Sequence, residues 1–235
     1  LKRVLKKSDA IIVLTKDYQE FVKNKYKISS NKIRIIPNST IFKISNKNSL
    51  HRKVSNVLFV GRLSKEKNVN LLISSLYLLK NEKLNLSIIG AGPEKQNLFN
   101  LVKKYHLNEK IKFLGVKRNE QLYKKYLESD IFILPSKIES FSTTLLEAMA
   151  TGMPIIASNI LGTRNIVKNN YNGLLVEPTP EKIAEAIEKL IKNPKLRERL
   201  AKNGLKEVKK YSWDKIVKQT EQVYREVLKE HENKQ

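Results

Sequence analysis

The sequence predicts an α/β protein, built on a doubly wound parallel sheet and ending in helices. Apolar runs of strand length recur at residues 56–60, 84–89, 111–114, 131–134, 154–157 and 173–176. Helical patterns lie between them, near residues 69–80, 94–105, 119–128, 142–151 and 162–168. Such regular alternation is typical of parallel strands joined by right-handed helical crossovers, with helices on both faces of the sheet. At 235 residues the chain can form one large domain of this kind and part of another.

The segments outside this alternation predict how the chain is divided. Residues 1–8 read as a short basic helix, 10–14 as a buried strand, 17–26 as a helix and 32–36 as a strand that ends at Pro37 and Asn38. Residues 41–55 are rich in Asn, Lys and Ser without periodicity, which indicates a linker. Helices are expected at 180–192, 194–210 and 213–231. We therefore expect four parts: residues 1–38, a linker at 39–55, a main domain at 56–211 and a last helix at 212–235.

The composition excludes several classes of protein. Hydrophobic residues make up 40% of the chain, with 7 Pro and 8 Gly, which are values of a globular protein. The absence of Cys excludes disulfides and Cys-ligated metal sites, and the three His are too scattered for a metal site. No apolar run reaches 18 residues and no signal peptide is visible, so we expect a cytoplasmic protein without a metal.

The charge is unusually positive. The chain has 46 Lys and Arg against 23 Asp and Glu, a net charge of +23. Because the lysines are spread over nearly every helix and no nucleic-acid motif is present, we expect no nucleic-acid partner. Two interpretations stay open: a generic lysine-rich surface, and attraction to anionic lipid or to lipid-linked phosphate acceptors at the inner face of a membrane.

The chemistry concentrates in residues 130–158, DIFILPSKIESFSTTLLEAMATGMPIIAS. Pro135 stops the strand at 131–134, so the following loop leaves the carboxyl end of a strand, where open α/β sheets bind ligands. Ser142, Thr143 and Thr144 are residues favoured at a helix start. The unpaired N–H groups and the positive dipole end of such a helix attract an anion such as phosphate.

Two carboxylates flank this helix start. Glu139 lies in the loop, where it would face the group attached to a bound phosphate, and Glu147 lies one turn into the helix, where it could accept hydrogen bonds from a vicinal diol. Simpler interpretations are a solvated loop carboxylate for Glu139 and a capping box between Thr144 and Glu147. The pair of carboxylates within a strand, loop and helix favours the ligand site over either alternative.

A second group of candidates follows the strand at 56–60. Gly61, Arg62 and Lys67 lie between that strand and the next helix, and Arg and Lys there suit a diphosphate. Asn68 tolerates the left-handed conformation that a sharp helix start requires. The alternative is that Arg62 and Lys67 are ordinary surface cations. Further on, the Gly90 and Gly92 pair predicts a tight turn with a helix opening at Pro93, because the third glycine of a dinucleotide fingerprint is absent.

Taken together, these stretches resemble the "glycosyl transferases group 1" family of retaining GT-B glycosyltransferases. The two glutamates match the Glu, seven residues, Glu signature of that family, and LLEAMATGMPIIAS matches its continuation. Four further stretches are also similar to the family: KIRIIPNST, GRLSKEKN, the turn at Gly115 and the start of the last helix at YSWDK. The resemblance covers essentially the whole chain. It implies a Rossmann-like C-terminal donor-binding domain at 56–211, the end of an N-terminal acceptor domain at 1–38, and a C-terminal helix that crosses back to the first domain.

The resemblance also implies roles for single residues. Gly61, Arg62, Lys67, Ser142, Thr143 and Thr144 would bind the donor diphosphate, and Glu147 the ribose. The sugar would lie beside Glu139, Ser140 and Phe141, and Glu139 would be the catalytic residue. The base of the nucleotide would lie beside Gly115 and Val116. No metal and no cofactor would be needed, since the nucleotide-diphosphate sugar is a substrate.

We therefore expect the donor-binding half of a retaining, metal-independent glycosyltransferase of glycan biosynthesis, acting on a saccharide or lipid-linked acceptor. Two alternatives stay open: a sugar-nucleotide epimerase of GT-B build, and a non-catalytic subunit that only binds a sugar nucleotide. Because most of an acceptor domain is missing, the 235-residue chain by itself is expected to bind a donor and to transfer sugar very poorly.

Overall fold

The structure, a computed structural model, describes residues 1–45 and 53–233. The chain forms two compact units. One comprises Leu1–Ile41 and Lys209–Gln235, and the other comprises Phe42–Val208. Within the predicted linker at 39–55, residues 46–52 lie outside the described residues. None of the described helices combines the length and the apolar character needed to cross a membrane.

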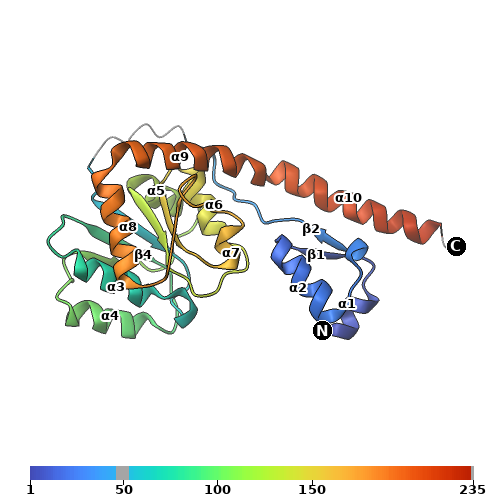
Figure 1. Ribbon diagram of the computed structural model, residues 1–235, viewed down its shortest axis with the longest axis horizontal. Helices are drawn as coiled ribbons and strands as arrows, with labels where there is room; N and C mark the ends of the chain where they lie inside the picture. The colour runs from blue at the N-terminus through green and yellow to red at the C-terminus, as the bar shows by residue number, and fades with distance from the viewer. Residues whose placement is uncertain (46–52, 234–235) are drawn as a thin grey trace. The chain divides into compact units, whose positions relative to one another are not determined.

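The larger unit is built on a six-stranded parallel sheet, as predicted (Figure 1). Its strands are β3 (Asn56–Val60), β4 (Asn85–Ile89), β5 (Ile111–Phe113), β6 (Ile131–Leu134), β7 (Ile155–Ser158) and β8 (Leu174–Val176). Every residue of β6 and β7 is buried. Burial on both faces explains why these strands read as continuous apolar runs rather than alternating ones.

The order of the strands creates a switch point. The sheet runs β5-β4-β3-β6-β7-β8, and β3 pairs with β6 at its centre through Val57 and Ile131. From β3 the chain moves outward to β4 and β5, then returns to β6 and moves outward in the other direction. In open α/β sheets ligands bind at such a reversal, outside the carboxyl ends of the central strands.

Helices connect the strands and cover the sheet. They are α3 (Val69–Leu78), α4 (Lys95–Lys104), α5 (Asn119–Glu128), α6 (Thr143–Ala150), α7 (Leu161–Arg164), α8 (Pro180–Lys192) and α9 (Pro194–Val208). In Figure 1, α8 lies beside α3, and these two helices pack against each other, as do α6 and α9. The right-handed crossover rule places α3 and α4 on one face and α5 and α6 on the other.

Most of the predicted helix bounds lie within two residues of the observed ones, and two of the differences have a cause that the structure shows. The helix expected at 162–168 is reduced to α7, because the buried side chain of Asn172 binds the backbone beyond it. Lys168 N–H donates to Oδ1 of Asn172 at 2.6 Å, and Nδ2 of Asn172 donates to the Ile166 carbonyl at 3.0 Å. The helix expected to open at Pro93 begins at Lys95. Lys95 N–H donates to the Gly92 carbonyl at 3.2 Å in a tight turn, and the first α-helical bond runs from Leu98 N–H to the carbonyl of the N-cap, Glu94, at 2.9 Å.

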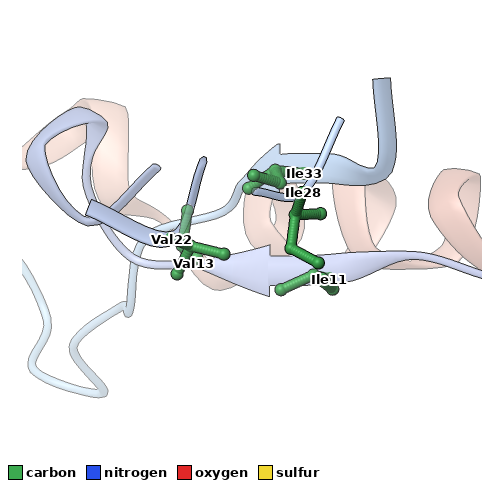
Figure 2. Close-up of a cluster of buried hydrophobic side chains, with 5 residues drawn as sticks. All are labelled: Ile11, Val13, Val22, Ile28 and Ile33. Carbon is green, nitrogen blue, oxygen red and sulfur yellow. The ribbon is translucent and has the colours of Figure 1, made fainter. Parts of the chain in front are cut away.

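The smaller unit combines α1 (Lys2–Lys7), β1 (Ile11–Val13), α2 (Lys16–Tyr26), β2 (Ile33–Ile35) and α10 (Trp213–Glu232). The two strands pair in parallel. Their core consists of apolar side chains from both strands, α2 and the segment after it, drawn in Figure 2: Ile11, Val13, Val22, Ile28 and Ile33. Residue Ile36 packs against Ile216 and Val223 of α10, so the last helix belongs to this unit.

Candidate functional site

The candidate site lies where the loops leave the carboxyl ends of β3 and β6. After β3, residues Lys65–Lys67 form a single 3-10 turn, and Asn68 follows with φ 50° and ψ 35°. This left-handed conformation is the one that the Asn68 side chain was expected to tolerate. It redirects the chain into α3 and leaves Lys67 at the end of the turn.

Across the switch point, Lys67 meets Glu139. The Lys67 ammonium and Oε1 of Glu139 form an ion pair, and Ser136 Oγ donates to the same oxygen at 2.8 Å. The side chains of Lys67 and Glu139 are only 21% and 8% exposed, respectively. The backbones of the two loops are also joined, since Lys137 N–H donates to the Glu66 carbonyl at 2.7 Å. The structure thus brings together two predicted site residues that are 72 positions apart.

Arg62 has a different environment from Lys67. Its side chain is exposed, and it makes no hydrogen bond or ion pair with another residue in the part of the chain that the structure describes. A guanidinium in this state keeps all its donors available for a planar, bidentate contact with an anion. One of the two cations predicted to bind the diphosphate is therefore paired, and the other forms no ion pair within the described residues. The Ser64 side chain and, as a smaller effect, the charge of Arg62 lower the pKa of Glu66.

Glycines allow the loops after β3 and β4 to touch. A Cβ atom on Gly90, whose φ is +140°, would lie 1.9 Å from the carbonyl oxygen of Gly61, and one on Gly92 would lie 2.3 Å from that of Leu63. Leu63 N–H donates to the Ala91 carbonyl at 2.9 Å. The predicted tight turn at Gly90 and Gly92 thus supports the Arg62 loop.

The hydroxyl residues lie at the start of α6, as predicted. Ser142 is the N-cap and Thr143 the first helical residue, and Ser142 Oγ lies 2.9 Å from Thr144 Oγ1 rather than capping a backbone N–H. The capping box considered for Thr144 and Glu147 is wrong, because Thr144 lies inside the helix and is not its cap.

Glu147 points toward α5. The hydroxyl of Tyr126 donates to Oε2 of Glu147 at 2.7 Å, while Oε1 has no hydrogen-bonding partner among the described residues. Burial raises the pKa of the Glu147 carboxyl above its usual value, and the hydrogen bond from Tyr126 opposes this rise. Burial raises the pKa of Tyr126 well above its usual value, so its hydroxyl stays a proton donor.

Backbone packing holds Glu139 in place. A Cβ atom on Gly162 of α7 would lie 2.0 Å from the Glu139 carbonyl oxygen, so only glycine permits this approach. Of the two residues that follow Glu139, Ser140 is exposed and does not adopt the left-handed conformation, and Phe141 is buried. The loop therefore presents a carboxylate beside a polar and an aromatic residue.

The loop after β5 borders the same edge of the sheet. Gly115 has φ +67°, and its carbonyl accepts a hydrogen bond from Gly90 N–H at 2.9 Å. Val116 is 56% exposed and lines an open hollow of about 750 Å³, together with residues at the start of α5: Arg118, Asn119, Glu120 and Gln121.

The sequence did not identify three residues of the site: Ser136, Tyr126 and Gly162. Ser136 lies two residues after the end of the strand, next to Pro135, so its place in the chain is a usable signal. Tyr126 reads as one apolar position of a helix, and Gly162 as the first residue of the helix expected at 162–168. Their partners lie 3, 21 and 23 positions away in sequence, respectively, and only the folded chain reveals those pairs.

Comparison with known proteins identifies the family. The profile of the family described as "Glycosyl transferases group 1" matches residues 40–207. An uncharacterized glycosyltransferase of Methanocaldococcus jannaschii is 36% identical over 172 residues, which are 72% of this chain and 44% of that protein. The capsular polysaccharide biosynthesis glycosyltransferase CapM of Staphylococcus aureus is 32% identical over 179 residues, 75% of this chain and 47% of CapM.

Among solved structures, the pneumococcal O-GlcNAc transferase GtfA, crystallised with UDP and GlcNAc, has a similar fold. Its TM-score is 0.84 at 21% sequence identity, over 97% of this chain and 47% of that one. The chain thus spans about half the length of the relatives it matches. The parallel sheet, its switch point and these similarities lead to one conclusion: the chain belongs to the glycosyl transferases group 1 family and has the fold of GT-B glycosyltransferases.

Proposed function

We propose that this chain is the donor-binding half of a retaining glycosyltransferase that uses a nucleotide-diphosphate sugar. The observation that carries the proposal is the meeting of Lys67 and Glu139 at the switch point of the sheet. A cation for a phosphate and a carboxylate for a sugar are thereby placed side by side, where open α/β sheets bind ligands.

The donor diphosphate would be held by cations and by backbone N–H groups. Arg62 offers a guanidinium that forms no ion pair within the described residues, and the Lys67 ammonium can exchange Glu139 for phosphate. Gly61 allows close approach at the strand end. Ser142, Thr143 and Thr144 open α6, whose first N–H groups are free of any side-chain cap from Ser142 and suit an anion.

The rest of the donor would extend along the same edge. Glu147 would accept hydrogen bonds from the ribose, and Gly115 and Val116 would border the base at the hollow before α5. The sugar would lie against Glu139, Ser140 and Phe141. UDP is the first nucleotide to try, because the similar pneumococcal enzyme was crystallised with it.

The chemistry follows from these positions. The bond from the anomeric carbon to the diphosphate oxygen breaks, and its electron pair leaves on the diphosphate, where Arg62, Lys67 and the α6 start stabilise the added negative charge. These groups take the place that a metal ion has in other phosphate sites, so we propose a metal-independent reaction. Glu139 orients the sugar and stabilises positive charge at the anomeric carbon. The acceptor oxygen bonds to that carbon with retention of configuration, and its proton passes to the departing diphosphate.

The acceptor is proposed to be a saccharide or a lipid-linked saccharide on the cytoplasmic side of a membrane. The net charge of +23 supports attraction to such phosphate-bearing acceptors and to anionic lipid. Sedimentation with vesicles of phosphatidylglycerol, against vesicles of phosphatidylcholine, tests this part. Binding to neither kind of vesicle would remove the membrane from the proposal.

Two measurements test the donor site. A thermal-shift screen of UDP-, GDP- and ADP-sugars should reveal one donor, since ligand at 100 times its dissociation constant adds about 2.7 kcal/mol to the free energy of unfolding. Radiolabelled donor then separates the alternatives. A new glycoside supports a transferase, an epimeric sugar nucleotide supports an epimerase, and binding without turnover in the full-length protein supports a binding subunit.

A further inference from the structure

We propose that Tyr126 is a positioning residue that sets the ribose selectivity of the nucleotide site by orienting the Glu147 carboxylate. The inference rests on the proposed function, because it assumes that Glu147 meets a ribose. It adds a residue that no motif of the sequence singles out. The role of that residue is measurable, since it concerns discrimination between nucleotides with and without a 2′,3′-diol.

The hydrogen bond to Tyr126 divides the Glu147 carboxylate into two unlike oxygens. Oε2 accepts the Tyr126 hydroxyl at 2.7 Å, whereas Oε1 has no partner in the described parts of the chain, residues 1–45 and 53–233. A carboxylate held through one oxygen cannot turn freely about its terminal torsion. Its second oxygen is then fixed in direction before any ligand arrives, and it retains its lone pairs for hydroxyl donors.

The ring of Tyr126 is itself immobilised. Its side chain is 0% exposed. Phe132 of β6 stacks on it at 5.6 Å between ring centroids with an interplanar angle of 25°, and Phe42 meets it edge to face at 5.2 Å. A side chain enclosed in this way keeps one rotamer, so the hydroxyl stays at one place beside Glu147. The phenol thus acts as a rigid support and not as a mobile surface group.

The hydrogen bond also favours the useful ionisation state of Glu147. A buried carboxylate tends to take up a proton, and a protonated carboxyl accepts fewer hydrogen bonds. The Tyr126 hydroxyl donates to the ionised form and so counteracts the effect of burial on the pKa. The Tyr126 hydroxyl therefore both orients the Glu147 carboxylate and favours its negative charge.

The fold gives this contact a second consequence. Tyr126 lies on α5, and the same helix begins at Asn119, which lines the hollow beside Val116 where we place the base. One helix thus connects the proposed base site with the proposed ribose site. Substitution of Tyr126 is expected to disturb ribose recognition more than the diphosphate contacts. Arg62 and Lys67 lie on the loop after β3, and the hydroxyl of Tyr126 reaches the start of α6 only through the longer contact with the Thr144 carbonyl, at 3.4 Å.

The same helix provides a matched control. Tyr123 lies one turn before Tyr126, and its hydroxyl donates to the Lys43 carbonyl at 3.3 Å, not to Glu147. Its ring also meets Phe42 edge to face, at 5.0 Å. Tyr123→Phe therefore removes an identical hydroxyl from the same helix and the same aromatic cluster without touching the carboxylate.

The experiment measures affinity by titration calorimetry. UDP, GDP and ADP are titrated into the 235-residue chain, and the tightest binder is then compared with its 2′,3′-dideoxy counterpart. The comparison is repeated for Tyr126→Phe, Tyr123→Phe and Glu147→Gln. The ratio of the two dissociation constants is read within each variant, so a lowered folded fraction cancels from it.

The unsubstituted chain and Tyr123→Phe should prefer the ribose form by about tenfold or more, the effect of one hydrogen bond to a charged group. Tyr126→Phe should lose most of that preference and approach Glu147→Gln. A Tyr126→Phe variant that keeps the full ratio would overturn the positioning role and leave the donor site intact. A chain that binds the nucleotide without preferring ribose would overturn the role of Glu147 and Tyr126 alike. Failure of all three nucleotides to bind would remove the proposed function itself.

Discussion

Lys67 and Glu139 form an ion pair that joins the loops after β3 and β6 across the switch point of the sheet. Both side chains are largely buried, and Ser136 adds a third group to the same carboxylate oxygen. Within this pair each charge neutralises the other. We expect a diphosphate to take Glu139's place beside Lys67, which releases the carboxylate toward the sugar.

The first prediction concerns the two cations. Arg62→Ala and Lys67→Ala should each weaken binding of the nucleoside diphosphate about ten- to a hundredfold, because a charge-assisted contact with phosphate is lost. Titration calorimetry measures the change. Lys65→Ala is the control, since Lys65 is an exposed lysine of the same turn and has no assigned role. Unchanged affinity in both variants would refute the diphosphate-binding role of Arg62 and Lys67.

The second prediction separates the two glutamates. Glu147→Gln should weaken nucleotide binding through the ribose, whereas Glu139→Gln should leave nucleotide affinity at least equal, because Lys67 then loses its competing partner. Turnover of the sugar nucleotide in the full-length protein should fall in Glu139→Gln. If Glu147→Gln binds the nucleotide normally, its carboxylate only supports Tyr126 and the ribose assignment fails.

The third prediction is a pH dependence. Burial raises the pKa of Glu147, so this carboxyl takes up its proton at a higher pH than an ordinary glutamate. As the pH falls through that raised pKa, the preference for the ribose form over the dideoxy form should decline. The ratio is used because ionisation of the terminal phosphate affects both ligands equally. Glu147→Gln should have a flat ratio over the same range.

The same shift has a consequence for stability. Between its ordinary pKa and the raised one, Glu147 binds more protons in the folded chain than in the unfolded chain. Its contribution to the free energy of unfolding therefore increases as the pH falls through that window, and is unfavourable above it. Denaturant titrations at several pH values should give a smaller increase for Glu147→Gln. If the free energy of unfolding of Glu147→Gln increased as much as that of the unsubstituted chain, the raised pKa of Glu147 would not be the cause.

The fourth prediction concerns Gly162. Alanine there would place its Cβ 2.0 Å from the Glu139 carbonyl oxygen, so the loop must move and the free energy of unfolding should fall by about 1 to 3 kcal/mol. Gly204→Ala in α9 is the control, because the nearest atom that its Cβ would meet is Cγ of Met149, at an ordinary 3.4 Å. That helical substitution should be neutral or stabilising by about 0.5 to 1 kcal/mol. Thermal melts compare the two, and equal melting temperatures would argue against the close packing of α7 on Glu139.

Much of the fold was predictable, because local patterns decide it. The strands at β6 and β7 are buried on both faces and therefore appear as uninterrupted apolar runs. Asn68 was recognised as a residue that tolerates the left-handed conformation, and the structure has it in that conformation. The end of α7 was not predictable, since it depends on the side chain of Asn172, which binds backbone groups several residues before it.

The candidate site was predictable in its residues but not in its contacts. Strand ends and residue types pointed to Lys67 and Glu139, yet nothing local indicates that they pair across 72 positions. The contact of Tyr126 with Glu147 depends on how α5 and α6 lie against each other, which a helical periodicity does not contain. Long-range packing thus decides which of the candidate residues meet.

The most direct test of the account is a crystal structure of this chain with the nucleoside diphosphate that binds it best. The account predicts the diphosphate between Arg62, Lys67 and the first N–H groups of α6, with the Lys67 ammonium moved from Glu139 to a phosphate oxygen and Oε1 of Glu147 on a ribose hydroxyl. A diphosphate bound elsewhere, with the ion pair of Lys67 and Glu139 intact, would contradict it.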